Sequence, residues 1–356
     1  MKLPWRDAME QALYGPGGFF VAGTGPAANF RTSVHASPVF ARSLLRLITH
    51  VDTALNFPDP FDVVDVGAGR GELLRALSAG VTLGVSGEPT RSGPALGSDT
   101  ALVPLAQRVR FTAVELAPRP GDLPEQINWA EKIPAGIIGL LIATEWLDNV
   151  PLDLAIHTPE GWHYLLVDPT SGADTTGGPV SEADADWLNT WWPLPTDSAP
   201  TTARAEIGRT RDEAWADAVG HVDRGLALAV DYGHLRGDRP VDGSLTGYRG
   251  GRQVPPVPDG SCDVTAHVAM DSVASAGARV GRCAYFLGSQ REGLRALGAD
   301  GGRPPLSLAA RDPAEYVRAL AEASAVAELT DPAGLGGHWW LWQPVGLPAD
   351  RLPLPA

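Results

Sequence analysis

The chain has 356 residues, of which 44% are hydrophobic and 20% are charged, so it is long and apolar enough to fold around a buried core. Acidic residues outnumber basic ones 42 to 28, and the formal net charge of −14 argues against binding to nucleic acid or to an anionic membrane, because both need a basic surface. The two cysteines form no disulfide framework and no Cys-x-x-Cys motif, and the first residues lack the apolar segment of a signal peptide. We therefore expect a cytoplasmic protein with reduced thiols and no bound metal.

Short apolar runs alternate with amphipathic segments along the chain. The apolar runs predict strands at residues 62–66, 109–115, 137–144, 226–231, 282–287 and 338–343, and a hairpin that joins 152–157 to 162–167. The amphipathic segments predict helices at 39–54, 72–79, 182–192, 204–224, 265–276 and 313–329, the last with Asp312 as N-cap and Pro313 in its first turn. Glycine- and proline-rich segments predict loops at 86–100, 168–180, 193–203 and 237–260, and an extended surface tail after residue 344. The alternation indicates an α/β fold with a mostly parallel sheet and helices on both faces.

Three glycines follow the first predicted strand in a strand–turn–helix context typical of a cofactor-binding loop. Gly67, Gly69 and Gly71 have a Gly-x-Gly-x-Gly spacing, whereas a dinucleotide fingerprint requires a glycine at the position of Glu72. Glu72 would repel a pyrophosphate, but S-adenosyl-L-methionine (SAM) carries a positive sulfonium and no phosphate. Asp65 can accept hydrogen bonds from amino or hydroxyl groups of such a cofactor. The alternative is a tight turn with a purely structural role.

Glu115 ends the second strong strand and is the candidate to bind the two ribose hydroxyls of SAM. It lies farther along the chain from the glycines than is usual for such an acid, and the predicted loop at 86–100 accounts for the excess. A solvated strand end is the alternative for this residue.

Two further strands are followed by pairs of polar residues. Glu145 and Asp148 follow the strand at 137–144 with a spacing that places both carboxylates on one side of a helical turn. Asp231 and His234 follow the strand at 226–231. Because ligands in open α/β sheets bind beyond the carboxyl ends of the strands, we expect these residues beside the glycine turn. Each of them alone is compatible with a helix cap or a loop charge.

Seven motifs in a common order make the chain resemble the MidA-like family of SAM-dependent methyltransferases, whose mitochondrial members assist the assembly of complex I. The resemblance extends from about residue 9 to residue 276. The motifs are MEQALYGPGGFF, FRTS, VVDVGAGRGELL, AVELAP, TEWLDNVPLD with PEGWHYLLVD, VDYGH, and GYRG followed by CDVTAHV. Each motif alone is weak, whereas seven in the order of the family are specific.

The resemblance implies a class I methyltransferase (Rossmann-like) fold with additional helical and hairpin insertions, a SAM cofactor and, by analogy with the mitochondrial branch, methylation of a protein arginine. The residues that match the family motifs are Asp65, Gly67, Gly69 and Gly71 in the cofactor loop, Glu115 after the second strand, Glu145 and Asp148 beside the reaction centre, and Thr32 and Ser33 in the segment that folds over the cofactor. The chain departs from the family at His35, where a glutamate is usual, and at Thr144, where asparagine or histidine is usual.

These residues suggest a mechanism in which Glu145 and Asp148 orient an arginine guanidinium and Asp231 or His234 takes its proton. The alternatives are a small-molecule methyltransferase on the same fold and a SAM-binding assembly or regulatory factor without turnover. The expected partner is a protein that presents an arginine or a small-molecule acceptor, with neither nucleic acid nor membrane involved; a homodimer is compatible with the sequence.

The predicted elements divide the chain into five segments. We expect an N-terminal helical and loop segment over the cofactor site at 1–55 and a SAM-binding core at 56–150. A hairpin and helical insertion that faces the substrate follows at 151–225. The rest of the sheet and the C-terminal helices occupy 226–345, and an extended tail occupies 346–356.

Overall fold

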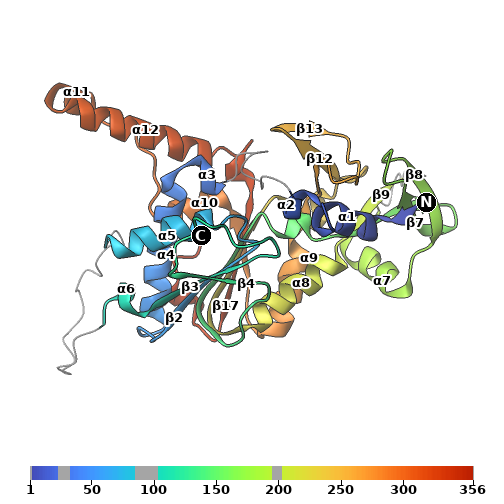
Figure 1. The fold of residues 1–356 in the computed structure, drawn as a ribbon, viewed down its shortest axis with the longest axis horizontal. Coiled ribbons are helices and arrows are strands. Elements are labelled where there is room, and N and C mark those ends of the chain that lie inside the picture. The colour runs from blue at the N-terminus through green and yellow to red at the C-terminus, as the bar shows by residue number, and fades with distance from the viewer. Residues whose placement is uncertain (1, 23–32, 85–102, 195–202, 356) are drawn as a thin grey trace.

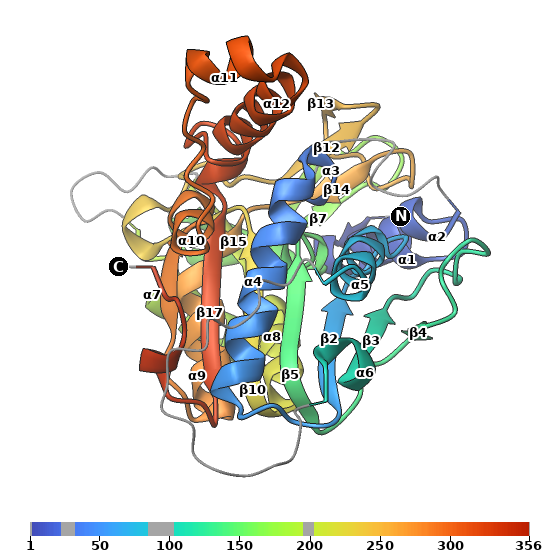
Figure 2. The ribbon, with the colours of Figure 1, turned by 90° about the vertical axis from the view of Figure 1, so that its left-hand side faces the viewer.

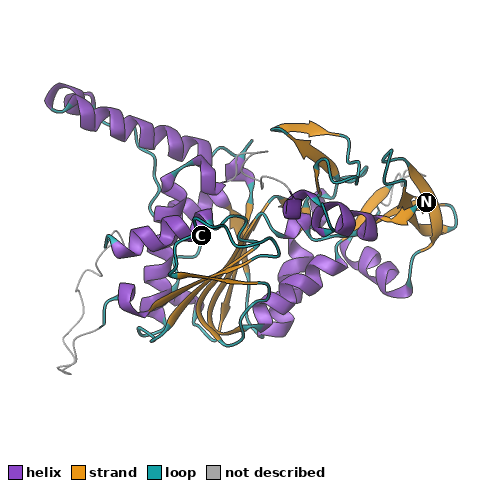
Figure 3. Ribbon diagram, viewed as in Figure 1, coloured by secondary structure: helices purple, strands orange, loops and turns teal. Residues whose placement is uncertain are grey.

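The computed structural model describes residues 2–22, 33–84, 103–194 and 203–355. A seven-stranded sheet in the order β16-β17-β10-β5-β2-β3-β4 forms its centre, with helices on both faces (Figures 1 and 3). Its strands are β2 (Phe61–Val66), β3 (Val109–Val114), β4 (Ile127–Ala130), β5 (Ile137–Thr144), β10 (Val222–Asp231), β16 (Phe286–Ser289) and β17 (Trp339–Val345). Strands β4, β3, β2, β5 and β10 pair in parallel, whereas β17 is antiparallel to both β10 and β16. The α/β class is confirmed, with a central sheet that is mixed.

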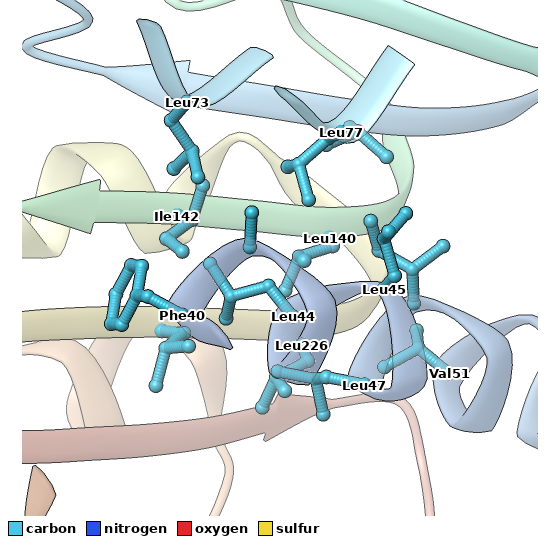
Figure 4. Close-up of a cluster of buried hydrophobic side chains, with 14 of the residues drawn as sticks. Phe40, Leu44, Leu45, Leu47, Val51, Leu73, Leu77, Leu140, Ile142 and Leu226 are labelled. Atoms are coloured by element: carbon cyan, nitrogen blue, oxygen red, sulfur yellow. The ribbon is translucent and has the colours of Figure 1, made fainter. Parts of the chain in front are cut away.

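The two faces of the central sheet carry separate apolar cores, because successive side chains of a buried strand point to opposite faces. Leu140 and Ile142 of β5 pack on the first face with leucines from two helices, as Figure 4 shows. Leu141 and Ala143 belong to the second core. The helices of the first face are α4 (Pro38–Ala54), α5 (Glu72–Thr82), α10 (Gln290–Ala296) and the end of α12 (Pro313–Leu329), and those of the second are α8 (Arg209–Gly220) and α9 (Met270–Gly281).

A second, antiparallel sheet lies beside the central one, at the right of Figure 1. It consists of β1 (Leu3–Pro4), β6 (Asp153–Thr158), β7 (Gly161–Val167), β8 (Asp174–Pro179) and β9 (Arg204–Ile207). Helix α1 (Trp5–Tyr14) buries Trp5, Met9 and Leu13 against it, and α7 (Glu182–Trp191) packs Trp187 and Leu188 against Ala155 and its neighbours. The hairpin that the sequence predicts is therefore confirmed as β6–β7.

The remaining elements are short. They are α2 (Phe19–Ala22), α3 (Ser33–Ala36), α6 (Leu105–Arg108), α11 (Leu306–Arg311), the 3₁₀ turns η2 (Leu147–Asn149), η3 (Arg236–Asp238), η4 (Leu335–Gly337) and η5 (Ala349–Arg351), and the strands β11 (Gly233–His234), β12 (Thr246–Arg249), β13 (Arg252–Val254), β14 (Asp263–Thr265) and β15 (Val268–Ala269). Helices α11 and α12 project from the body as an arm, which Figure 2 shows at the top. None of the described helices is long and apolar enough to cross a bilayer.

Two predicted helices are wrong in their extent. The segment at 204–224 contains strand β9, then α8, then the start of β10, because Gly208 interrupts the helical pattern and β9 pairs with β6. The segment at 265–276 begins with β14 and β15, so His267 lies between two strands and the helix starts at Met270. The predicted loops at 168–180 and 237–260 contain β8, β12 and β13. The predicted loop at 86–100 and most of that at 193–203 lie outside the described residues.

From the first apolar core we predict how far truncation of a central side chain lowers the free energy of unfolding. Leu44 on α4 is 0% exposed, so Leu44→Ala removes buried methyl groups and leaves a cavity, which costs about 2–5 kcal/mol of unfolding free energy. Leu83, just after α5, is 77% exposed, and Leu83→Ala should change the same quantity by less than about 0.5 kcal/mol. Chemical denaturation of both variants measures the difference. Equal losses in the two would contradict the assignment of Leu44 to the core.

Candidate functional site

A cavity of about 620 Å³ opens beyond the carboxyl ends of β2, β3 and β5. In open α/β sheets this is where ligands bind. Its wall consists of Glu10, Tyr14, Phe20, Val34, Asp65, Val66, Gly67, Ala68, Gly69, Glu72, Leu73, Val114, Glu115, Leu116, Glu131, Lys132, Ile133, Thr144, Glu145, Trp146, Asn149, Val150, Pro151, Asp217 and His221. The predicted residues Asp65, Gly67, Gly69, Glu115 and Glu145 therefore share one cavity.

The glycine turn forms the floor of this cavity and requires its glycines. Gly67, Gly69 and Gly71 all have left-handed backbone, with φ values of 71°, 58° and 77°. A Cβ on Gly67 would lie 2.6 Å from Cδ1 of Trp146, and one on Gly71 would lie 2.7 Å from Cδ1 of Leu123. Gly71 does not line the cavity but caps the start of α5. It therefore positions the turn.

Asp65 places an unsatisfied acceptor in the cavity wall. Its side chain is 2% exposed, and Oδ1 has no hydrogen-bond partner among the described residues. Burial, followed by the charges of Glu115 and Glu72, raises the pKa of Asp65 well above its usual value. Oδ1 itself is enclosed, so a positively charged donor would reach the carboxyl from the cavity side, and its charge would offset the repulsion from the neighbouring acids.

Glu115 ties the glycine turn to the end of β3. Its Oε2 accepts a hydrogen bond from the backbone N–H of Gly69 at 3.0 Å, and Oε1 accepts from Leu116 at 2.7 Å and Ala117 at 3.1 Å. Since a carboxylate has about four acceptor positions, these bonds leave Oε2 with room for one further donor. The residue fixes the turn and still presents an acceptor to the cavity.

Glu145 lies at the other end of the site in a strained conformation. Its φ of 51° is left-handed, which is rare for a residue with a side chain and is concentrated at functional sites. The carboxyl Oε1 accepts from the backbone N–H of Ser33 at 3.3 Å, which ties α3 to the cavity. Burial, reinforced by the charge of Asp148, raises the pKa of Glu145 to about 8.

Asp148 lies behind the cavity wall. It is 2% exposed and does not line the cavity, and its Oδ2 accepts from the hydroxyls of Tyr232 and Thr265, the latter at 2.7 Å. Burial raises its pKa. Arg211, 1% exposed, donates to the backbone carbonyls of Val150, Ala266, His267 and Asp148 around it. Asp148 therefore supports the turn that follows β5 without facing the ligand space.

Asp231 and His234 also lie outside the cavity wall. Asp231 Oδ2 accepts from the backbone N–H groups of Leu147 at 3.0 Å and Asp148 at 3.3 Å, so this carboxylate caps the η2 turn. His234 lines a different cavity, of about 610 Å³, and its Nδ1 accepts from Arg239 at 2.7 Å. Thr32 lies outside the described residues, whereas Ser33 is 1% exposed and contacts Glu145 through its backbone.

Several residues of the wall escaped the sequence analysis. Tyr14 and Phe20 stack with ring centroids 5.6 Å apart and cover one side of the cavity. Glu10 and Tyr14 are four residues apart on α1, a spacing that places them on one helix face and was a usable signal. Asn149 gave no sequence signal, because its position depends on the turn after β5.

Comparison with known proteins identifies the family. The family model described as "Putative S-adenosyl-L-methionine-dependent methyltransferase" matches residues 95–286, which is more than half of the chain. The chain belongs to this family of SAM-dependent methyltransferases. Its cofactor is SAM.

Solved structures of similar fold agree with this assignment. A Burkholderia thailandensis protein crystallised with S-adenosylhomocysteine has a TM-score of 0.76 at 22% sequence identity, over 99% of this chain and 90% of that chain. A native crystal structure of a protein from the same organism and superfamily has a TM-score of 0.73 at 23% identity, over the same shares of the two chains. At this identity the likeness shows the fold. No curated protein matches the sequence.

The residues of the cavity fit the family's cofactor. The carboxyl of Asp65 in the cavity wall suits an ammonium group, and the remaining acceptor position of Glu115 suits a ribose hydroxyl. The glycine turn approaches the cavity without side chains, and Glu72 at the start of α5 disfavours a phosphate. The acceptors, the glycine turn and the charge of the cavity are therefore compatible with SAM.

The contact between Gly67 and Trp146 predicts a loss of SAM binding. Gly67→Ala strains the backbone and displaces Trp146 from the cavity wall, so the affinity for SAM should fall at least tenfold. Gly84 has a similar φ of 66° but open space around its Cα, which makes Gly84→Ala a control for backbone strain alone. Calorimetric titration with SAM compares the variants. Wild-type affinity in Gly67→Ala would show that the turn is not part of the cofactor site.

Proposed function

We propose that this chain is a class I SAM-dependent methyltransferase of the MidA-like type that methylates the guanidinium of a protein arginine. The acidity of the cavity wall is the observation that carries the proposal. Seven carboxyl groups line it, from Glu10, Asp65, Glu72, Glu115, Glu131, Glu145 and Asp217, against Lys132 and His221. A guanidinium is a permanent cation with five N–H donors, so an acidic wall both attracts and orients it.

In this proposal one end of the cavity holds the cofactor. When bound, SAM supplies an activated methyl group on a positively charged sulfur. The glycine turn lets the backbone approach it, Asp65 accepts from its ammonium group, and Glu115 accepts from a ribose hydroxyl. Ser33 donates to Gln290 Oε1 at 3.0 Å and to Glu145, so it holds the acceptor end in place.

At the other end, Glu145 is the group that contacts the methyl acceptor. A guanidinium is a poor nucleophile until a proton leaves or its charge is localised on one nitrogen, and a carboxylate beside it does both. We assign the proton to Glu145, because Asp231 is used in the η2 turn and His234 lines another cavity. Asp148, bound to the hydroxyls of Tyr232 and Thr265, acts on Glu145 through its charge, which raises the pKa of Glu145.

A small-molecule acceptor is the second candidate. Tyr14, Phe20 and Trp146 give the cavity an apolar side, which is typical of an enclosed metabolite site. Incubation of the protein with methyl-labelled SAM and a fractionated cell lysate distinguishes the two. Label in protein, released as methylarginine on hydrolysis, supports the proposal; label in the small-molecule fraction supports the second candidate. SAM binding without transfer to either would support a factor without turnover.

The raised pKa of Glu145 predicts the pH dependence of the reaction. Ionised Glu145 is the form that accepts a proton, so kcat/KM for an arginine acceptor should rise with pH and level off above about 8. Glu145→Gln should lower the rate about 100-fold and abolish this rise. Initial rates of label transfer between pH 6 and 9 measure both effects. Glu125→Gln, on an exposed loop, is the matched control, and an unchanged profile in Glu145→Gln would contradict the assignment.

A further inference from the structure

The turn after β5 contributes a second polar residue to the cavity wall besides Glu145, the buried Asn149. It ends η2, is 5% exposed, and lines the cavity that Asp148 does not reach. Glu145 and Asn149 therefore flank the turn, and both residues belong to the cavity wall.

The amide of Asn149 has a fixed orientation. Its Nδ2 donates to Oδ1 of Asp263 at 2.7 Å and to the carbonyl of Val264 at 3.4 Å. An amide nitrogen has two N–H groups, so both are used on the side of β14. The carbonyl of Val264 can only accept, which assigns the nitrogen to this side whatever the protonation of Asp263.

Because both N–H groups of the Asn149 amide are used, its side-chain oxygen Oδ1 is the polar atom that can bind a ligand in the cavity. Oδ1 of Asn149 receives no hydrogen bond from any described residue, and it is not among the fully enclosed polar atoms that lack a partner. The hydroxyl of Tyr14, across the same wall, donates at 3.3 Å to the backbone carbonyl of Asn149, which leaves the side-chain oxygen free. The wall thus presents a neutral acceptor beside the acidic Glu145.

Among the described residues of the cavity wall, Asn149 is the one to which Asp263 is hydrogen-bonded. Asp263 is 0% exposed on β14, away from the cavity wall, and its contact with the site runs through the Asn149 amide.

We propose that Asn149 is a substrate-binding residue whose side-chain oxygen accepts an N–H of the methyl-acceptor nitrogen, and that Asp263 is the positioning residue that holds this oxygen toward the cavity. The inference rests on the proposed function. It adds how the site recognises its methyl acceptor, namely by an N–H group on the acceptor nitrogen. Such a wall favours amines and guanidinium groups and disfavours carboxylates, because an acceptor facing an acceptor is repulsive.

Binding of short peptides to the protein loaded with S-adenosylhomocysteine tests the proposal. The probes are acetyl-Gly-Arg-Gly-amide and acetyl-Gly-Glu-Gly-amide, titrated by calorimetry. Wild type should bind the arginine peptide more tightly. Asn149→Ala should weaken that binding about tenfold and leave the affinity for S-adenosylhomocysteine within twofold, whereas Asn189→Ala, at an exposed position of α7, should change neither.

A double-mutant cycle separates positioning by Asp263 from a structural role. Asp263→Ala should weaken arginine-peptide binding severalfold in wild type and not at all in the Asn149→Ala background, since it acts through the amide. Asp263→Asn keeps a side-chain oxygen that can accept from the Asn149 amide, so it should retain the binding that Asp263→Ala loses. The two variants at position 263 also serve if Asn149→Ala fails to fold, with the affinity for S-adenosylhomocysteine as the control.

Four outcomes would overturn the inference in part or in whole. If Asn149→Ala binds the arginine peptide as tightly as wild type, Asn149 does not bind the acceptor. If the losses of affinity from Asn149→Ala and Asp263→Ala add up in the double variant, Asp263 does not act through Asn149. A wild-type protein that binds S-adenosylhomocysteine but prefers the glutamate peptide overturns the selection of an N–H donor while the cofactor site stands. A wild-type protein that binds no S-adenosylhomocysteine overturns the proposed function and this inference with it.

Discussion

The buried guanidinium of Arg211 holds together the segments on which the site is built. It donates to the backbone carbonyls of Asp148 within the η2 turn and Val150 just after it, and to those of Ala266 and His267. One side chain therefore joins the turn after β5 to the chain between β14 and β15. Hydrogen bonds from a charged donor contribute about 1.5–3 kcal/mol each, and a buried guanidinium without them would be strongly destabilising. Asp148 and Asp231 supply the opposite charge nearby. The placement of Glu145 and Asn149 depends on this arrangement.

The acids of the site form two layers with different tasks. Asp65, Glu115 and Glu145 face the cavity, while Asp148, Asp231 and Asp263 lie behind it and bind hydroxyl, backbone N–H and amide donors. Burial and the charges of neighbouring carboxyl groups raise the pKa of Asp65 and Glu145 in the wall and of Asp263 behind it. A cation in the cavity would offset these negative charges, which agrees with the sulfonium and ammonium groups of SAM and, in the proposed function, with a cationic acceptor.

The sequence predicts the sheet better than it predicts the turns that carry chemistry. Buried strands such as β2 and β5 are continuous apolar runs, and α12 begins at Pro313 as its Asp312 cap indicates, with Asp312 accepting from the N–H of Glu315 at 2.9 Å. Strand β9 was missed, since its pairing with β6 is remote in the chain. The pairing of Glu145 with Asp148 was inferred from helical spacing, but the left-handed backbone at Glu145 sends the two carboxyls to opposite sides of the wall. Asn149 could not be found from the sequence, because its orientation depends on Asp263 and Val264.

The order of strands in the central sheet has a consequence for biosynthesis. Strand β17 lies between β10 and β16 but follows both in the chain, and it pairs with β10 over residues 339–345 and with β16 over residues 339–342. Until residue 345 has left the ribosome, β10 and β16 both present unpaired edges, and the tryptophans at 340 and 342 cannot enter the core. Nascent chains at this stage are prone to misassociation, because unpaired strand edges can pair with other chains. Formation of β17, the last strand of the sheet, covers both edges and so lowers the tendency to aggregate.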